Sequence, residues 1–419
     1  MGSALEYFDF AVYGALSATV FPKLFFSGLG DTGSLLASFA TFGVGFAARP
    51  VGALVFGHLG DRLGRKPILF TTLLIMGGSS LLIGLLPTGM GAGVAALLVI
   101  LRFLQGVSLG GEATGNQLMT MEHGDPKRRG LLGAFVNVGA PIGQVAANLV
   151  LAVLTASLSQ AQWESWGWRA PFLASILLVG VTLFLRVKVD ETPVFVADRS
   201  TLETSESHSE TGLRVLSAQW RQVLQLALGW GGPSLGFYLM AIFGLHYLQE
   251  NVGLSTGTTF VIFTIANAVS AAFTFTGGWV SDQIGRKRSV LISFTAATAG
   301  MTLFFTLASS VSVPVLTVII GFSFSSIQFG TGIQPALFAE QFPTRFRFAG
   351  SAMSFTLANL LFSAPGPFLA AAIFAAGGVR YVMWMGIGVM AVSFLAICTI
   401  KDRSRADLAP LSLSGNTAR

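Results

Sequence analysis

The stretch GHLGDRLGRK occupies residues 57–66, and a second version of it, GWVSDQIGRK, occupies residues 278–287. Both copies keep the pattern G-x-x-x-D-x-x-G-R-K, and the second begins 221 residues after the first in a chain of 419 residues. A repeat at about half the chain length predicts two homologous halves, each with its own copy of the same turn.

Each residue type in this pattern has a physical reason to stand between two helices. Glycine lets the chain reverse tightly, aspartate can cap a helix N-terminus, and basic residues can meet helix C-termini and anionic lipid head groups. A basic turn that only orients the chain in a membrane would explain the charges but neither the aspartate nor the glycines. We therefore predict a gating motif, whose members are Gly57, Asp61, Arg62, Gly64, Arg65, Lys66, Asp282, Gly285 and Arg286.

The composition is typical of a membrane protein. Hydrophobic residues make up 53% of the chain, charged residues make up 11%, and the mean hydropathy is +0.70. Soluble domains carry about a quarter charged residues, so soluble proteins, disordered chains and nucleic-acid binders are disfavoured. The single cysteine, Cys398, excludes intrachain disulfides and is expected to be a buried thiol. The four histidines have no ligand spacing, so we expect no metal and no cofactor.

Apolar runs long enough to cross a bilayer recur about twelve times between short connections. The first run contains Glu6 and Asp9 in place of a basic segment and a cleavage site, which indicates a retained helix rather than a signal peptide. We predict an all-α polytopic membrane protein with twelve transmembrane helices in two pseudo-symmetric six-helix bundles. The expected spans are 4–27, 34–57, 67–87, 93–119, 131–156, 169–187, 221–249, 256–278, 289–309, 313–337, 347–376 and 379–400.

The polar segments divide the chain. Residues 188–220 mix acidic residues with Ser and Thr, which predicts a solvated linker between an N-terminal half at 1–187 and a C-terminal half at 221–400. Residues 401–419 form a tail. Most of the 25 Lys and Arg residues lie in alternate connections, the linker and the tail, so the positive-inside pattern predicts that both termini are cytoplasmic. An interfacial aromatic belt is expected of the neighbouring tryptophans Trp163, Trp166 and Trp168.

The repeated loop resembles the signature loop of the major facilitator superfamily. Further stretches resemble its metabolite:proton symporter family, whose members carry shikimate, α-ketoglutarate, citrate, and proline or betaine. The resemblance covers nearly the whole chain, and it implies the major facilitator fold, a bacterial cytoplasmic membrane and transport by alternating access. These stretches are ALEYFDF (4–10), FGVGFAARP (42–50), RFLQG (102–106), GGE (110–112), WGWRAPF (166–172), DETP (190–193) and EQFPTR (340–345).

Ionisable residues inside the expected helices point to proton coupling. Buried charge is costly in a membrane and usually faces a cavity or a partner. A carboxylate opposite an arginine is a natural switch, because protonating Asp9 would release Arg102 to a substrate anion. In sugar:proton symporters of the same superfamily, an Asp in helix 1 and an Arg in helix 4 are similarly placed. The alternative is a permanent ion pair, which gives little net stability. The predicted proton-coupling residues are Asp9, Arg102, Glu6 and Glu112.

Arginine is the expected counter-charge for a substrate anion. Arg49, just before Pro50, could bind a carboxylate or lock its helix against a neighbour. Polar residues on other spans could complete a central cavity, although each alone is also explained by an interhelical hydrogen bond. The predicted substrate-binding residues are Arg102, Arg49, Tyr13, Gln105, Asn137, Gln144, Tyr238 and Gln328, and further polar residues of this kind are Asn148, Asn267, Gln334 and Asn359.

These expectations combine in one function. We expect a monomeric secondary transporter in the lipid bilayer that imports a small organic anion, a mono- or dicarboxylate metabolite, by proton symport. The alternatives are a proton-coupled importer of a zwitterionic osmolyte such as proline or betaine, a proton-coupled drug exporter, and a transporter-like membrane sensor. No nucleophile or phosphate-loop pattern supports an enzyme, and we expect no nucleic-acid partner.

Overall fold

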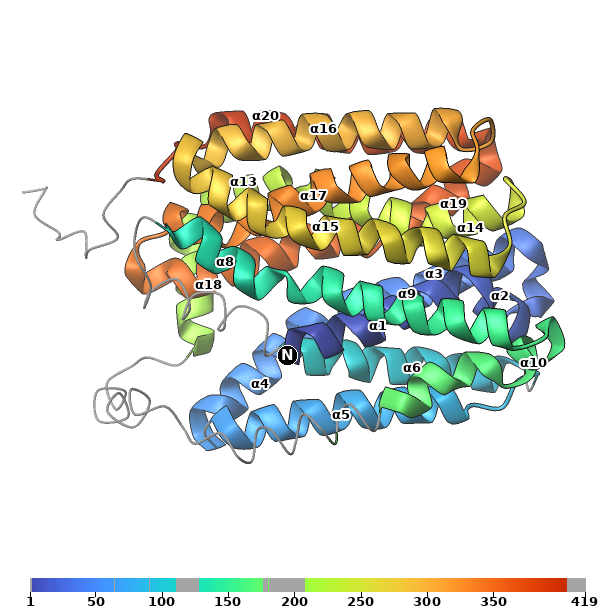
Figure 1. Cartoon of the computed structure of the whole chain (residues 1–419). Coiled ribbons are helices and arrows are strands. Elements are labelled where there is room, and N and C mark those ends of the chain that lie inside the picture. Colours follow the sequence, from blue (N-terminus) through green and yellow to red (C-terminus); the bar gives the residue numbers. More distant parts are fainter. Residues whose placement is uncertain are drawn as a thin grey trace, which may run out of the picture.

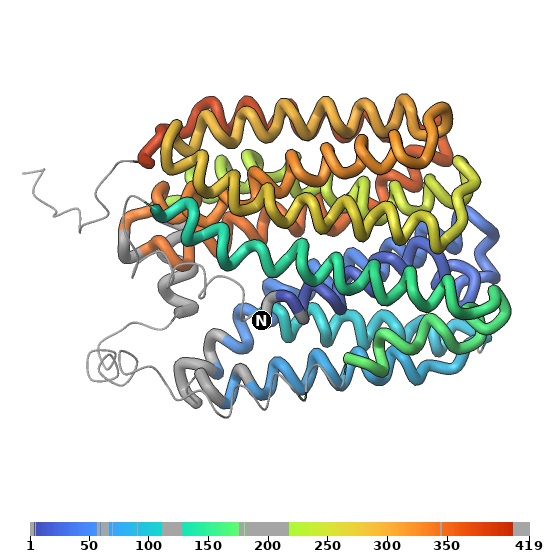
Figure 2. The backbone as a smooth tube through the Cα atoms, in the orientation of Figure 1, coloured from blue at the N-terminus to red at the C-terminus, as the bar shows by residue number. Residues whose placement is uncertain are grey.

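The computed structural model describes residues 2–63, 65–89, 91–110, 128–175, 180 and 208–404. Over these residues the chain forms helices joined by turns, and no strand occurs among them. Most of the long helices lie side by side along a common direction, so that the turns gather at the two ends of the bundle (Figures 1 and 2).

The bundle contains two sets of helices. Up to residue 175 they are α1 (Gly2–Thr19), α2 (Phe21–Phe25), η1 (Ser27–Leu29), α3 (Gly30–Ala47), α4 (Arg49–Leu63), α5 (Arg65–Leu85), α6 (Ala92–Leu109), α8 (Arg129–Asn137), α9 (Gly139–Ser157), α10 (Gln160–Ser165) and η3 (Gly167–Arg169). From residue 208 onward they are α13 (His208–Tyr238), η5 (Leu239–Phe243), α14 (Gly244–Glu250), α15 (Thr256–Ile284), α16 (Arg286–Leu307), α17 (Val313–Gln341), α18 (Thr344–Ala358), η6 (Asn359–Ser363), α19 (Gly366–Gly377) and α20 (Val379–Thr399).

These helices cover the expected spans. Ten of the twelve are helical over most of their length. The fourth, 93–119, is helical up to residue 109 and lies outside the described residues from 111 onward, and the sixth, 169–187, lies largely outside them, although 170–175 are helical. Among the described residues, nine helical segments are long and apolar enough to cross a membrane. The prediction of an all-α polytopic membrane protein is therefore confirmed.

Five spans predicted as continuous helices are interrupted, and prolines stand close to four of the interruptions. α1 and α2 part at Val20, two residues before Pro22. α3 and α4 part at Ala48, because Pro50 has no N–H to continue the hydrogen-bond ladder. α8 and α9 part at Val138, three residues before Pro141. The π-helical turns η5 and η6 interrupt the other two, η6 shortly before Pro365. The interrupted spans are 4–27, 34–57, 131–156, 221–249 and 347–376.

The chain becomes helical before the expected end of the linker. α13 begins at His208, inside the segment 188–220, and its one non-helical residue, Gln219, bends it close to the expected start of the second half. Residues 188–207 of the linker lie outside the described residues, as do 181–187 before it.

The two sets of helices pack along α8 and α9, which lie against α15. Gly130 on α8 and Gly278 on α15 touch so closely that a Cβ atom on either would stand 2.5 Å from the carbonyl oxygen of the other. Near the far ends of α9 and α15, a Cβ on Gly257 would lie 3.5 Å from Thr155 Oγ1. Small residues at these points let the helix backbones approach, as is typical of helix packing in membranes.

Two expectations about single side chains are corrected. Only Trp166 of the expected aromatic belt is exposed, at 49%, whereas Trp163 and Trp168 are buried. The Trp168 ring packs edge-on against Phe21 and Phe25 inside the first set of helices, where apolar neighbours outweigh the pull of the interface. Cys398, expected to be buried, is exposed on α20.

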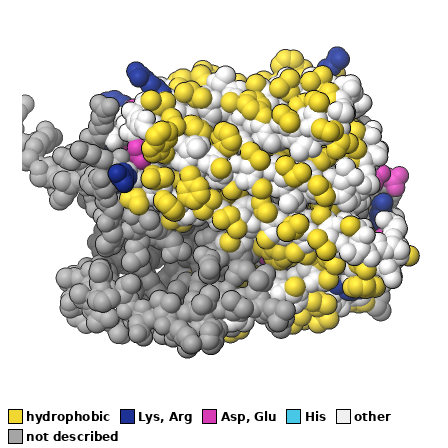
Figure 3. Space-filling model, viewed as in Figure 1, with side chains coloured by type: hydrophobic (Ala, Val, Ile, Leu, Met, Phe, Trp, Pro, Cys, Tyr) yellow, Lys and Arg dark blue, Asp and Glu magenta, His cyan; other side chains and the backbone are white. Residues whose placement is uncertain are grey.

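The surface separates apolar flanks from charged ends. Apolar side chains cover much of the flank seen in Figure 3, and Lys and Arg lie toward its ends. Exposed large apolar residues such as Leu54, Val318 and Leu395 suit contact with lipid chains. The start of α8, the α15–α16 turn and the end of α20 meet at one end of the bundle (Figure 1), which we call the basic end because it carries Arg128, Arg129, Arg286, Lys287, Arg288, Lys401 and Arg403.

Candidate functional site

Asp9 is the centre of a buried polar network inside the first set of helices. Its carboxylate accepts hydrogen bonds from Ser80 Oγ at 2.6 Å, from Gln105 Nε2 at 2.8 Å and from Ser175 Oγ at 3.5 Å. Gln105 Nε2 also donates to Ser80 Oγ at 2.7 Å. Asp9 is 4% exposed, so these bonds take the place of water around the carboxylate.

Arg102 is enclosed beside this network. Its side chain is fully buried, and its guanidinium carbon lies 3.9 Å from the centre of the Phe10 ring and 4.0 Å from that of Tyr13. Arg102 Nη1 donates to Gln105 Oε1 at 3.1 Å. Among the described residues, Nε and Nη2 have no hydrogen-bond partner. A buried cation that keeps two unused donors is costly, which is typical of a functional group rather than of a structural one.

Gln105 stands between the Asp9 carboxylate and the Arg102 guanidinium, two groups that were predicted to face each other directly. Its amide oxygen faces Arg102 and its amide nitrogen faces Asp9, so the contact between the two charges runs through one amide group. Arg102 and Gln105 are three residues apart on α6, and residues three apart share a helix face, which is consistent with this arrangement. A change of charge on Asp9 therefore reaches Arg102 through the orientation of a single side chain.

Arg49 also contacts the Phe10 ring. Its guanidinium carbon is 4.7 Å from the centre of the Phe10 ring and 4.5 Å from that of Phe46. The residue is only partly buried, and its Nε has no hydrogen-bond partner among the described residues. The break between α3 and α4 places Arg49 at the first residue of α4. Two arginines thus contact one phenylalanine ring, and Arg49 is the less enclosed of the two.

The two tyrosines predicted for the site differ in position. Tyr13 is fully buried, and its hydroxyl donates to Thr41 Oγ1 at 2.7 Å. Tyr238 lies where the two sets of helices meet, with its ring centre 5.2 Å from that of Phe46 and 5.1 Å from that of Phe237. Tyr13 therefore belongs to the Arg102 side of the site, and Tyr238 connects the Arg49 side to the second set of helices.

The predicted amide side chains have separate environments. Asn137 Nδ2 donates to the Thr331 carbonyl at 2.7 Å, an interhelical bond between α8 and α17. Gln144 is buried on α9, next to Gly143, whose missing side chain leaves room for the backbone of α1. Gln328 is buried on α17, and its Oε1 has no hydrogen-bond partner among the described residues.

The other two predicted proton-coupling residues are acidic. Glu6 is partly buried on α1 and is not one of the described partners of Asp9. Glu112 lies outside the described residues.

The second copy of the repeated loop connects the two sets of helices at the basic end. Asp282 accepts hydrogen bonds from the backbone N–H of Gly130 at 2.9 Å and of Leu131 at 3.0 Å, so it caps the first turn of α8. Arg286 Nη1 lies 2.6 Å from Asp282 Oδ1, and Arg286 Nη2 lies 3.2 Å from Glu340 Oε1. Gly285 has φ +95°, which favours glycine at the turn into α16. We call Asp282, Arg286, Glu340 and the first turn of α8 the latch.

The first copy of the loop is described only as backbone. Gly57, Asp61 and Arg62 lie in α4, and Arg65 and Lys66 begin α5. Gly64 lies outside the described residues.

Replacing Asp282 with Ala should open the basic end. The change removes two backbone hydrogen bonds to a charged acceptor, each worth about 1.5–3 kcal/mol, and should raise the population of forms with separated helix ends about tenfold or more. Spin labels at the exposed positions 128 and 288, in a Cys398→Ser background, would report the distance. Asp31→Ala, an exposed acid at the start of α3, is the control and should leave the distances unchanged. Equal distance distributions for Asp282→Ala and the unaltered protein would contradict the latch.

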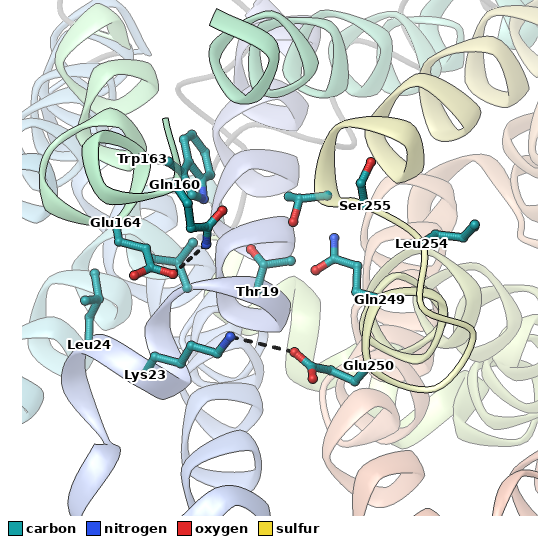
Figure 4. Close-up of a pocket in the computed structure, with 12 residues that line it drawn as sticks. Thr19, Lys23, Leu24, Gln160, Trp163, Glu164, Gln249, Glu250, Leu254 and Ser255 are labelled. Atoms are coloured by element: carbon teal, nitrogen blue, oxygen red, sulfur yellow. Dashed lines mark hydrogen bonds and ion pairs between the residues drawn. The ribbon is translucent and has the colours of Figure 1, made fainter. Parts of the chain in front are cut away.

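A pocket lies at the opposite end of the bundle, between α2, α10, α14 and the start of α15 (Figure 4). Lys23 Nζ lies 3.8 Å from Glu250 Oε1 across it, and both side chains are more than half exposed. Exposed ion pairs of this kind contribute about 0–1 kcal/mol. None of the predicted site residues lines this pocket.

Several residues in or near the Asp9 network, and one residue of the latch, were not among the predicted site residues. Ser80 and Ser175 carry no sequence signal, because isolated serines are common in membrane helices. Phe10 follows Asp9 in the sequence. The role of its ring depends on contacts with Arg49 and Arg102, which lie far away in the sequence. Glu340 begins the quoted stretch EQFPTR but was not assigned to the gating motif.

Comparisons with known proteins agree on the family. The family model for the Major Facilitator Superfamily matches residues 2–357 and residues 233–416. The inner membrane metabolite transport protein YhjE of Escherichia coli (strain K12) is 34% identical over 383 residues, covering 88% of this chain and 85% of that protein. The shikimate transporter of the same strain is 29% identical, covering 97% and 93%. The ectoine/proline transporter ProP of Corynebacterium glutamicum is 32% identical, covering 88% and 76%.

Solved structures agree on the fold. A crystal structure of the D-xylose-proton symporter superposes with a TM-score of 0.75 at 18% identity, covering 96% of both chains. A partially occluded inward-open form of the xylose transporter XylE from E. coli gives a TM-score of 0.73 at 19% identity. Neighbours of this kind establish the major facilitator fold, and the family model and the relatives establish membership. This polytopic membrane protein therefore belongs to the major facilitator superfamily of transporters.

Proposed function

We propose that the protein imports a small organic anion, a mono- or dicarboxylate metabolite, by symport with protons through alternating access. The observation that carries the proposal is the buried connection from Asp9 through Gln105 to Arg102. Relatives named as metabolite and shikimate transporters support a metabolite as substrate. The name of one relative also supports a bacterial inner membrane as the location.

Asp9 is the proposed proton carrier. Ionised Asp9 holds the amide nitrogen of Gln105 and thereby holds the Gln105 oxygen against Arg102. A proton on Asp9 removes the charge that Gln105 and Ser80 donate to, which weakens this grip. Arg102 is then free to turn its donors elsewhere. Glu6 and Glu112 are the proposed secondary acids of the same pathway.

Arg49 is the proposed first partner of the substrate carboxylate. It is less enclosed than Arg102, and no ion pair or hydrogen bond among the described residues occupies its guanidinium. A guanidinium binds a carboxylate through two parallel hydrogen bonds, which fixes orientation as well as charge. Tyr238 packs against Phe46, the ring that Arg49 also contacts, so it lies close to the proposed position of the substrate carboxylate. Arg102, Tyr13, Gln105 and Gln144 are proposed as the surrounding residues.

Phe10 links the proton site to the substrate site. Its ring is in contact with both Arg102 and Arg49. Cations near one aromatic ring compete for its electron density, and each contact is worth about 0.5–2 kcal/mol. A shift of Arg102 after protonation of Asp9 therefore changes the surroundings of Arg49 through this ring.

Replacing Phe10 with Leu should uncouple the substrate site from the proton site. We expect the affinity for the substrate to lose most of its dependence on pH, because Leu fills the space without holding either cation. Binding measured by calorimetry between pH 5.5 and 8 would test this. Phe25→Leu, which removes a ring packed on Phe21 and Trp168, is the control and should keep the dependence. An unchanged pH profile in Phe10→Leu would show that the ring is only part of the core.

An importer of a zwitterionic osmolyte is the second candidate. Relatives named as ectoine/proline and proline/betaine transporters favour it. The aromatic rings around Arg49 and Tyr238 would also suit a quaternary ammonium group. The carboxylate of such a molecule would still require the arginine.

Uptake into proteoliposomes separates these candidates. The panel contains labelled succinate, malate, shikimate, proline and glycine betaine, each with and without an inward proton gradient. We expect at least one carboxylate without a fixed positive charge to accumulate only when the gradient is present. Accumulation of glycine betaine alone would support the osmolyte importer, and binding without any flux would support a sensor.

The proposal includes an orientation. The halves at 1–187 and 221–400 rock about the central site, joined by the linker 188–220, and the latch holds the cytoplasmic end closed in the outward-open form. The first copy of the loop, 57–66, has the same role at its own turn. The basic end, both termini and the tail 401–419 are then cytoplasmic, in keeping with the positive-inside rule. A single chain carries the complete site, so the proposed working unit is a monomer.

A further inference from the structure

Two buried amide oxygens on neighbouring helices have no hydrogen-bond donor. Asn267 on α15 is 1% exposed and Gln328 on α17 is 3% exposed. Among the described residues, Asn267 Oδ1 and Gln328 Oε1 accept no hydrogen bond. Asn267 Nδ2 donates to the Phe263 carbonyl at 2.8 Å, and this bond leaves the oxygen as the free end of the amide. An unpaired buried acceptor is costly and rare, so two of them together require an explanation.

The two oxygens lie in one layer of the bundle. α15 and α17 pack together, and two contacts bracket the amides: the Phe263 and Phe324 rings, 5.5 Å apart, and Gly332 against the Thr274 carbonyl. Asn267 follows Phe263 by four residues, and Gln328 follows Phe324 by four. Because one helical turn is about 3.6 residues, both amides stand one turn beyond the same ring pair.

Asn267 points to the inside of the bundle. At about 100° per residue, it lies within about 20° of Thr274 and of Gly278 around the axis of α15. Thr274 packs on α17, and Gly278 packs on Gly130 of α8. Asn267 is therefore directed between α17 and the helices of the first set. Gln328 lies between Phe324 and Gly332 around α17 and faces the same region.

A continuous row of rings connects these amides to Arg49. Phe324 lies 5.4 Å from Phe237, Phe237 lies 5.1 Å from Tyr238, and Tyr238 lies 5.2 Å from Phe46. Arg49 stands over Phe46 at 4.5 Å. The guanidinium of the first set of helices and the amides of the second set thus lie at opposite ends of one aromatic row across the interface.

We propose that Asn267 and Gln328 form the donor-binding half of the substrate site, so that the transported molecule is a carboxylate that also carries O–H or N–H groups. The inference rests on the proposed function, in which Arg49 binds the carboxylate. Amide oxygens accept hydrogen bonds from hydroxyl or ammonium groups, and they offer nothing to a second carboxylate or to a quaternary ammonium group, which has no N–H. A site built to bind a donor rejects the analogue that lacks it, because its own polar atoms stay unpaired.

Matched pairs of ligands test this in the purified wild-type protein. Calorimetry would compare malate with succinate, shikimate with cyclohex-1-enecarboxylate, and proline with N,N-dimethylproline. The members of each pair share a carboxylate and differ in their donors. For the pair that fits the site best, we expect the donor-bearing member to bind about tenfold to a hundredfold more tightly.

Two substitutions test whether the preference for donor-bearing ligands comes from the amides of Asn267 and Gln328. Asn267→Leu and Gln328→Met keep the side-chain size and remove the acceptors. We expect each to reduce the preference to about threefold or less, while the donor-free member binds as it does to the wild type. Gln341→Met is the matched control, because this buried amide lies on the same helix as Gln328 but at the basic end, where its Nε2 donates to the Lys401 carbonyl at 3.1 Å. The control should keep the full preference.

The outcomes distinguish a failure of this inference from a failure of the proposed function. If the wild type accumulates carboxylates with the proton gradient but binds both members of every pair equally, the donor-binding half is wrong and the symporter remains. The same holds if the two substitutions weaken both members equally. If no carboxylate of the panel binds or accumulates, the proposed function itself is wrong and the inference fails with it.

Discussion

Asp9→Asn should lower gradient-driven accumulation of the substrate to an internal-to-external ratio of about one while leaving exchange intact. Asn has nearly the shape of Asp and still accepts a hydrogen bond from Ser80, so the fold and the binding site remain. It cannot gain or lose a proton in the physiological range, and a symporter that cannot change charge at its coupling site cannot concentrate its substrate. Uptake and counterflow measured in the same proteoliposomes give both quantities.

Asp31→Asn is the matched control for this substitution. Asp31 is an exposed acid in the first turn of α3, away from the network, and the control should accumulate substrate as the wild type does. Unchanged accumulation in Asp9→Asn would contradict the coupling role of Asp9, and Glu6 and Glu112 would become the acids to test. Loss of exchange as well as accumulation would contradict the separation of binding from coupling.

Gly130→Ala should reduce uptake about tenfold or more by preventing closure at the basic end. A Cβ at this position would stand 2.4 Å from Arg286 Nη1, 2.5 Å from the Gly278 carbonyl oxygen and 2.5 Å from Ser281 Oγ. The backbone of α15 cannot give way, so α8 must move out and the latch must lengthen. Overpacking of this kind costs about 1–3 kcal/mol, which corresponds to a change of about 5–150-fold in the population of the closed form.

Gly321→Ala is the control for this steric effect. A Cβ on Gly321 of α17 meets no atom within 4 Å among the described residues, so the same chemical change occurs in open space. Binding of the substrate should survive in Gly130→Ala, because Gly130 packs on α15 at the basic end and none of its close neighbours belongs to the proposed substrate site. Normal uptake by Gly130→Ala would show that close contact of α8 and α15 is not part of the cycle.

The sequence predicts the architecture well because membrane spans need long apolar runs and the repeated loop marks the same turn in both halves. The interruptions were not predicted. Pro50 and Pro141 do stop a helical ladder, but many membrane helices tolerate proline, and π-helical turns such as η5 have no residue signature of their own. Trp168 shows the same limit, since a tryptophan near a predicted interface can equally complete a core.

The site follows from the sequence only in part. Spacing on one helix places Arg102 and Gln105 together, because residues three apart share a face. It does not tell which neighbouring helix that face meets, so Gln105 between two charges, Phe10 in contact with two arginines and the bond from Asn137 to Thr331 appear only in three dimensions. The unpaired oxygen of Gln328 is likewise a property of the packed helices, although the residue itself was a candidate.

Proton movement measured during transport tests the central claim most directly. The carboxylate that accumulates in the uptake assay is added to weakly buffered proteoliposomes that contain the purified protein. A pH electrode records the pH of the external medium. Proton symport predicts that the medium becomes more alkaline as the carboxylate enters, and that Asp9→Asn abolishes this change while exchange continues. Carboxylate uptake by the wild type with no change in external pH would contradict proton symport and the role of the Asp9 network in it.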